Sequence, residues 1–248
     1  MMRLAPCSMV RRVSRTVMKP GVTLLQSEII ACRRCPRLVH WRERIAREKV
    51  KRFVGETYWG KPLPGFGDPR GRLLLVGLAP AAHGGNRTGR MFTGDESGNW
   101  LFRALHDAGF ASQAQSTGRG DGLILTDCYI TAACRCAPPQ NKLLPIELSR
   151  CRPFLLREIA LLANVRVVVG LGRVGFDAAL AAYREAGRIQ YSRRPAFGHE
   201  ARYEINGLVF IASFHPSQQN TFTGRLTRPM LNQVFREVRR SLGKRESA

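Results

Sequence analysis

Apolar residues along this chain of 248 residues form short continuous runs that alternate with longer stretches of helical spacing. The short runs are typical of strands buried on both faces, and they occupy ranges 72–78, 123–133, 165–169 and 208–213. Helical spacing covers ranges 24–50, with a break near Pro36, and 99–109, 146–163, 174–186 and 228–242. This alternation predicts an α/β fold, a three-layer α/β/α arrangement around a central four-stranded, mainly parallel sheet.

The first 22 residues differ from the rest because they contain no acidic residue and end in Pro-Gly-Val. We expect a flexible basic N-terminal extension over 1–22 and a single folded domain over 23–248. Nowhere is the chain apolar over the roughly 20 residues that span a bilayer, so we expect no membrane partner. No secretory signal precedes the domain, which favours a cytoplasmic location with reduced thiols.

The charge of the chain is strongly positive, with 40 Lys and Arg against 18 Asp and Glu and a formal net charge of +22. Such a field attracts polyanions, and a protein that neutralises phosphates releases counterions and gains affinity for nucleic acid. The alternative is a solvated basic surface that partly reflects biased coding. We expect DNA or RNA as the partner.

Four cysteines occur as two separated pairs, Cys32-x2-Cys35 and Cys136-x14-Cys151. Thiols spaced in this way are typical of one shared metal centre, and about a hundred residues of chain must fold to bring the pairs together. Thiolate sets bind zinc or an iron–sulfur cluster, and the spacing does not choose between them. Buried free thiols are the alternative, whereas disulfides are disfavoured in a reducing compartment.

Two loops that follow predicted strands carry candidate chemistry, since ligands of such sheets bind beyond the carboxyl ends of strands. The Gly-rich loop 77–98 offers Phe92 as a stacking face and Asp95 as its first carboxylate, although Asp95 is equally suited to cap the next helix. In loop 214–229, His215 stands at a strand end, where its ring could donate a hydrogen bond. A structural histidine is the alternative there.

The sequence GLGRVG over 170–175 also satisfies a dinucleotide-binding pattern after a strand. The following segment, GRIQYSRRPAFGHE, places no acidic residue where the ribose would need one. We therefore expect a tight strand-to-helix turn with close packing rather than a nucleotide site.

The segments GLAPAAHGGNRTGRMFTGDESG, YITAACRCAPPQNK and HPSQQNTFTGRLT closely resemble the family 5 (type B) uracil-DNA glycosylases of bacteria and archaea, over about 24–242. The resemblance implies a four-stranded parallel α/β/α fold, a 4Fe-4S cluster and hydrolysis of the N-glycosidic bond of deaminated bases in DNA. On the matching positions the cluster ligands are Cys32, Cys35, Cys136 and Cys151. Two further thiols, Cys134 and Cys128, are expected to be bystanders.

A uracil inside a duplex is unreachable, so the nucleotide must rotate out into a pocket. We expect Arg225 and Leu226 to fill the vacated stack as a wedge. Cleavage leaves positive charge on the sugar and negative charge on the base. Phe92 would then stack the base, His215 would donate to a base oxygen, and Asp95 would orient water or offset the cation.

The resemblance also assigns further residues to the pocket, namely the side chains of Asn141 and Asn220 and backbone groups of Ala81, Ala82 and Gly84. Other uracil glycosylase families carry a polar residue after the first strand or an Asn at the end of the next, where this chain has Leu78, Ala79 and Ala132. Asp95 is therefore the leading acid. Looser base selection is expected, admitting hypoxanthine, xanthine or ethenocytosine, in a monomeric repair enzyme.

Two rival functions are weighed against this one. A non-catalytic DNA-binding protein with a structural zinc site made of four cysteines would explain the charge and the thiols, but not Asp95 and His215 on neighbouring loops. A cluster-bearing radical enzyme would need a three-cysteine C-x3-C-x2-C motif and an open iron site, whereas four protein thiolates leave none open.

Overall fold

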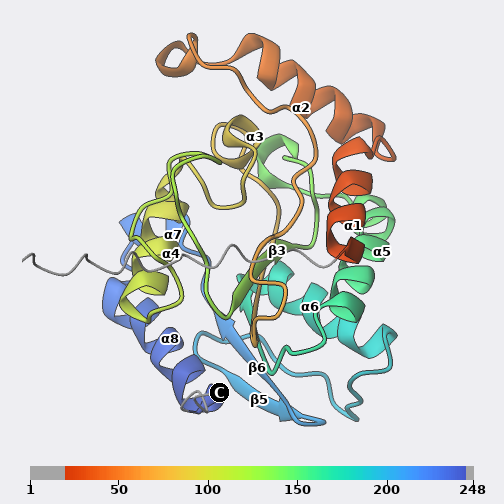
Figure 1. Cartoon of the computed structure of the whole chain (residues 1–248), viewed down its shortest axis with the longest axis vertical. Helices are drawn as coiled ribbons and strands as arrows, with labels where there is room; N and C mark the ends of the chain where they lie inside the picture. Colours follow the sequence, from red (N-terminus) through yellow and green to blue (C-terminus); the bar gives the residue numbers. More distant parts are fainter. Residues whose placement is uncertain (1–19, 244–248) are drawn as a thin grey trace, which may run out of the picture.

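The computed structural model describes residues 20–243, which form one sheet with helices on both faces (Figure 1). The sheet has six strands in the order β1-β3-β2-β4-β6-β5, and its four central strands are parallel. These strands are β2 (Leu73–Gly77), β3 (Cys128–Ala132), β4 (Val167–Leu171) and β6 (Leu208–Ser213). Every residue of all four is buried, which explains why they form continuous apolar runs in the sequence. The predicted fold class is confirmed.

The two edge strands, β1 (Phe66–Gly67) and β5 (Arg202–Ile205), were not predicted. Both pair antiparallel with their neighbours, β3 and β6. β1 is only two residues long, and β5 is half exposed with charged residues at alternate positions, so neither has an apolar run. β3 is also shorter than its run of 123–133, because Asp127 adopts a positive φ of 59° just before it and breaks the extended backbone.

Helices cover both faces of the sheet. On one face, α4 (Glu96–Asp107) and α8 (Arg228–Leu242) enclose a core with strand residues such as Leu75 and Val169. On the other, α5 (Pro145–Leu161) and α6 (Arg173–Glu185) pack on residues such as Val76 and Phe210. The remaining helices are α1 (Pro20–Ala31), α2 (Pro36–Glu48), η1 (Lys51–Phe53), α3 (Gly85–Thr88), η2 (Pro139–Asn141) and α7 (Gln218–Phe222).

The predicted boundary after residue 22 is wrong at its inner end, since α1 begins at Pro20. Val22 is buried, and α1 packs against α5. The rest of the expected extension, 1–19, lies outside the described residues. Among residues 20–243, no helix has the length and apolar character needed to cross a membrane.

The glycines of 170–175 serve close packing, as expected. A Cβ on Gly170 would lie 2.3 Å from Phe176 Cα, and one on Gly175 would lie 2.3 Å from the carbonyl oxygen of Val76. Helix α6 can therefore approach the sheet closely only because these positions lack side chains.

Candidate active site and cysteine-lined cavity

The loops after β2 and β6 meet beyond the carboxyl ends of the strands. The rings of Phe92 and His215 are stacked, with centroids 5.7 Å apart and an interplanar angle of 29°. The structure thus brings together two candidate residues that are 123 positions apart (215 − 92) in the sequence. The aromatic ring expected to stack a base and the imidazole expected to donate to it therefore lie at one place, beyond the strand ends.

Phe92 is held in an unusual backbone conformation. Its φ is 53°, in the left-handed region that non-glycine residues rarely adopt. Its ring covers the end of β2, where a Cβ on Gly77 would lie 2.9 Å from Phe92 Cζ. A Cβ on Gly98 would lie only 1.9 Å from the Phe92 carbonyl oxygen. Two glycines therefore let the ring and backbone of Phe92 lie close to β2 and α4.

Asp95 is the N-cap of α4, so the capping alternative is confirmed. Its Oδ1 accepts a hydrogen bond from Gly98 N at 3.0 Å. The other oxygen faces Gly84, where a Cβ would lie 2.0 Å from Oδ2. Desolvation by burial raises the pKa of Asp95, although backbone N–H groups of the helix oppose the shift. Capping occupies one oxygen and leaves the second beside the backbone of the Gly-rich loop.

His215 is neutral at physiological pH. Burial lowers the pKa of its imidazole to about 4, because desolvation disfavours the charged form. A neutral ring keeps one N–H donor for an oxygen that becomes negative. The backbone around it is fixed: Asn220 Nδ2 donates to the His215 carbonyl oxygen at 2.8 Å, and Gly172, with φ +82°, would place a Cβ 3.3 Å from His215 Cβ.

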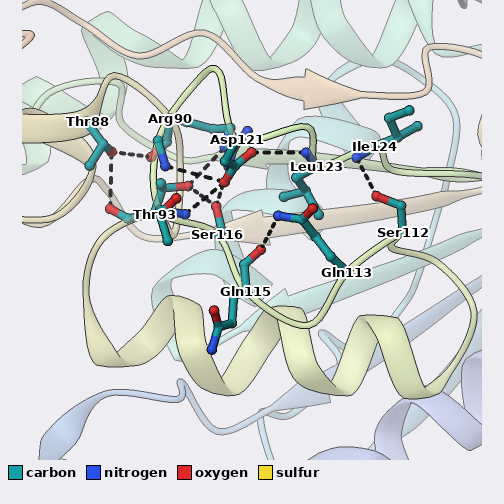
Figure 2. A network of polar contacts seen from close by, with 12 residues as sticks. Thr88, Arg90, Thr93, Ser112, Gln113, Gln115, Ser116, Asp121, Leu123 and Ile124 are labelled. Atoms are coloured by element: carbon teal, nitrogen blue, oxygen red, sulfur yellow. Dashed lines mark hydrogen bonds and ion pairs between the residues drawn. The ribbon is translucent and has the colours of Figure 1, made fainter.

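A buried polar network ties the Gly-rich loop to segment 112–124 (Figure 2). Arg90 is at its centre, donating from Nη2 to Asp121 Oδ2 at 2.5 Å and to Ser116 Oγ at 2.6 Å. Arg90 Nε donates to Thr93 Oγ1 at 3.1 Å, and this hydroxyl lies 2.6 Å from Ser116 Oγ. Burial alone would raise the pKa of Asp121, but Arg90 and backbone N–H groups lower it to about 2. The Arg90–Asp121 pair therefore stays charged, and the network fixes Arg90 and Thr93, which lie on either side of Phe92 in the chain.

Arg87 makes a second link across the same loop. Its Nε donates to the His83 carbonyl oxygen at 2.8 Å, and its Nη2 donates to the Gly94 carbonyl oxygen at 2.9 Å. It also pairs with Glu56. Neither Arg87 nor Arg90 was predicted from the sequence, although two arginines inside a Gly-rich loop are a detectable signal. The two arginines contact Thr93 and Gly94, so they act on Phe92 and Asp95 only through the backbone of the loop. No spacing in the sequence reveals such contacts.

The other predicted pocket residues are placed less closely. Ala81 and Ala82 are half-buried and share the loop with Gly84, whereas Asn141 is exposed at the end of η2, with φ 56°. Within the described part of the chain, no hydrogen bond joins the Asn141 side chain to Phe92, Asp95 or His215. The structure does not bring Asn141 into direct contact with the stacked rings.

The wedge prediction for Leu226 is wrong in this structure. Leu226 is 0% exposed and belongs to the core under α8, so it anchors the loop instead of projecting from it. Arg225 is exposed, and its guanidinium carbon lies 4.6 Å from the centre of the Phe214 ring. Residues 222–225 and 227–229 are exposed, so Leu226 alone turns inward at this point of the loop.

The four predicted ligands do converge from three separate segments. Cys32 and Cys35 lie between α1 and α2, Cys136 follows β3, and Cys151 lies in α5. All four line one small apolar cavity with Leu38 and Phe154. The described cysteines are free thiols. Across residues 20–243, no three His, Cys, Asp or Glu side chains are grouped closely enough for a single metal ion.

Cys134 also lines this cavity, although it was expected to be a bystander and is not one of the four predicted ligands. Arg135 makes a buried ion pair with Glu158 of α5, with Nη2 and Oε2 2.5 Å apart. Cys134 and Cys136 flank Arg135, and all three residues line the cavity. A hydrogen bond with Cys134 lowers the pKa of Cys151. Cys128 lies in β3, in the core under α4 and α8.

A buried arginine supplies positive charge to the thiols. Arg42 is 2% exposed, and its Nη1 donates to Cys136 Sγ at 3.0 Å. Burial raises the pKa of the Cys136 thiol to about 12, and Arg42 acts in the opposite direction. A dry cavity of soft thiols with a guanidinium donor suits an anionic thiolate-ligated cluster, whose charge that donor would offset. The donor set therefore fits an iron–sulfur group.

Comparison with known proteins agrees with this geometry. Residues 64–239 match the family described as the uracil DNA glycosylase superfamily. The chain is 50% identical over 216 residues to a type-5 uracil-DNA glycosylase of Thermus thermophilus, covering 87% of this chain and 95% of that protein. It is 47% identical over 221 residues to one of Mycobacterium bovis (88% and 81%) and 40% identical over 217 residues to one of Pyrobaculum aerophilum (88% and 92%).

Proposed function

The chain belongs to the uracil-DNA glycosylase superfamily, among its type-5 members, and from this premise we propose that it excises uracil from DNA by hydrolysing the N-glycosidic bond. The observation that carries the proposal is the pairing of Phe92 with a neutral His215, next to the loop that holds Asp95. The relatives give no support to the alternative of a non-catalytic zinc-bearing DNA-binding protein.

In this mechanism the extruded uracil stacks on Phe92, and the imidazole of His215 donates its N–H to a base oxygen. Because His215 is uncharged, the hydrogen bond strengthens as negative charge develops on the departing base, and no proton must first be lost. Asp95 lies on the side of the sugar, where its free oxygen orients water or offsets the positive charge. Asn220 acts on His215 through the backbone, which supports a positioning role.

We further propose that excision extends to hypoxanthine, xanthine and ethenocytosine. Leu78, Ala79 and Ala132 offer no side-chain hydrogen bond at the positions where other families read uracil. A pocket that recognises a base mainly by stacking and by backbone groups of Ala81, Ala82 and Gly84 discriminates weakly among bases. Asn141, which is exposed, is proposed to reach the base only when DNA is bound.

For the cofactor, we propose that Cys32, Cys35, Cys136 and Cys151 hold a 4Fe-4S cluster. When bound, such a group would tie α1 and α2 to the segment after β3, and it supplies no chemistry to the glycosidic bond. DNA carrying a damaged base is the proposed partner of a single domain, which includes all of α1 and acts as a monomer. Because chromosomal DNA is the substrate, we also propose a cytoplasmic location.

One experiment tests substrate and activity together. Anaerobically purified protein is incubated with oligonucleotides that each carry one damaged base, and abasic sites are then cleaved by alkali. Strand cleavage at uracil is expected, with slower cleavage at the other three bases. An intact uracil strand would contradict the function. Iron and sulfide analysis with a visible spectrum tests the cofactor separately, since stoichiometric zinc without iron would contradict the cluster.

A further inference from the structure

Phe222 is the most exposed of the large apolar side chains in the described residues, at 78%. It ends α7 and lies seven positions (222 − 215) after His215, on the same loop. A large aromatic ring held in water next to a catalytic loop is unfavourable unless a partner covers it. Other aromatic residues of the protein are buried in its core, whereas Phe222 is exposed because of its position on the loop.

The loop holds Phe222 outward between two fixed points. Asn220 is at one end, where its Nδ2 donates to the His215 carbonyl oxygen at 2.8 Å and its own carbonyl oxygen accepts from Leu226 N at 2.9 Å. At the other end, the side chain of Leu226 is buried in the core. Between them Gly224, with φ +69°, turns the chain back. Phe222 therefore projects from a closed loop whose base is attached to the active site.

The charges around this tip select a phosphate-bearing partner. Segment 214–229 contains no acidic residue. Two exposed arginines are stacked on aromatic rings, Arg225 on Phe214 at 4.6 Å and Arg228 on Trp100 at 4.9 Å. Stacking limits the freedom of each guanidinium and leaves its N–H groups available to phosphate oxygens. An exposed aromatic ring on a segment that also carries two such arginines fits the base stack of a duplex and its backbone.

We propose that Phe222 inserts into the DNA base stack and occupies the gap left by the extruded nucleotide, while Arg225 and Arg228 contact the flanking phosphates. This inference rests on the proposed excision of uracil, and it moves the wedge from Leu226 to Phe222. An aromatic ring replaces the stacking that the flipped base gives up, so it stabilises the extruded state in a duplex. A single strand has no ordered stack to fill, so the ring contributes little there.

The test compares Phe222→Ala with the wild type on uracil opposite adenine, uracil opposite guanine, and single-stranded uracil DNA. Single-turnover cleavage should fall about 10- to 100-fold on the adenine pair, less on the weaker guanine pair, and less than about 2-fold on the single strand. Phe222→Trp should restore the duplex rate. Val54→Ala is the matched control, since Val54 is also exposed, at 69%, but follows η1 and does not belong to the loop that carries Phe222.

A second measurement does not depend on cleavage. A 2-aminopurine placed beside the uracil fluoresces when its stacking is disturbed, and the fluorescence change on binding should be smaller with Phe222→Ala. An unchanged duplex rate and signal, or an equal loss on single and double strands, would overturn the insertion. Failure of the wild type to release uracil from any of the three substrates would instead contradict the proposed function, while the fluorescence change still reports on Phe222.

Discussion

The cysteine-lined cavity and the Phe92–His215 site both remove side chains from water, but they are built in opposite ways. The cavity joins thiols from three segments within an apolar cluster that includes Leu38 and Phe154, and its main polar neighbour is Arg42. The Phe92–His215 site is formed by two loops whose backbones are fixed by arginines and by glycines at close contacts. One region depends on which side chains meet, and the other on how the backbone is held.

The same physical cause, loss of water, therefore has different consequences in the two regions. In the cavity, burial raises the pKa of the Cys136 thiol, so a bound cation is needed to displace its proton. In the other site, burial keeps His215 neutral and raises the pKa of Asp95, which sets the two groups for opposite roles. Stability should depend on the first region, and the chemical step on the second.

Asp95→Asn should lower the rate of excision while leaving the fold intact, and we expect it to have the largest effect on that rate. Single-turnover excision of uracil should fall by at least about 100-fold, because Asn lacks the charge that assists the sugar or water. The unfolding temperature should change little, since Asn caps helices as well as Asp does. Asp107→Asn, at the exposed end of the same helix, is the control. Full activity of Asp95→Asn would exclude Asp95 as a catalyst.

Cys136→Ala should have the opposite outcome. Loss of a ligand should remove iron and destabilise the fold by on the order of 4 kcal/mol, which lowers the unfolding temperature by about 10 °C. The single-turnover rate of the folded fraction should stay within about 3-fold, because no step uses the thiols. Iron analysis and calorimetry measure these effects.

Substitutions of two other cysteines serve as controls for the loss of iron. Cys128→Ala, in β3 and outside the cavity, should keep its iron. Cys134→Ala should also keep its iron if Cys32, Cys35, Cys136 and Cys151 are the ligands. Iron loss from Cys134→Ala would assign Cys134 to the ligand set instead.

Ser116→Ala tests the network that supports the base site and should have a smaller effect. It removes the hydroxyl that bridges Arg90 and Thr93, so the Phe92 segment becomes less well fixed. We expect a 3- to 10-fold lower single-turnover rate, roughly what a misplaced contact costs, with little change in KM. Ser112→Ala removes a hydroxyl from the same segment but outside the network, where it accepts from Ile124 N at 2.9 Å. Equal effects of the two substitutions would argue against a positioning role.

The pH dependence should show the smallest effect. The pKa of His215 is about 4, well below the usual value, so the ring stays neutral as the pH falls from about 8 to 6. The rate should therefore stay within about 2-fold over this range, and it should fall at lower pH as Asp95, whose pKa is raised, and the imidazole become protonated. A rate that declines as the pH rises from 6 to 8 would indicate a protonated histidine. Single-turnover assays in overlapping buffers measure this profile.

The fold and the main candidates followed from local patterns because those patterns depend on few contacts. A strand buried on both faces must be apolar throughout, so β2, β4 and β6 were predicted to within about two residues. Helices α5, α6 and α8 were also predicted, from their helical spacing. The edge strands escaped because their stability comes from neighbours, and β5 has exposed charged positions.

Side-chain direction at turns was where local patterns failed. Leu226 and Phe222 lie in the same loop, and hydrophobicity alone favours neither as the exposed one. Packing of Leu226 under α8 settles the matter, because that contact joins residues that the sequence does not relate. The position of Cys134 in the cavity wall was not predicted either, because the cavity joins segments that lie far apart in the sequence.

Residue type and order were sufficient for the layered fold, because it depends on strand and helix periods, and their chemistry made the four thiols, Asp95 and His215 the candidates. Three features depend on contacts between distant segments: the stacking of His215 on Phe92, the support from Arg90 and Asp121, and the outward position of Phe222. Burial and electrostatic environment are properties of the assembled chain, so the pKa values of Asp95 and His215 belong to the tertiary structure as well.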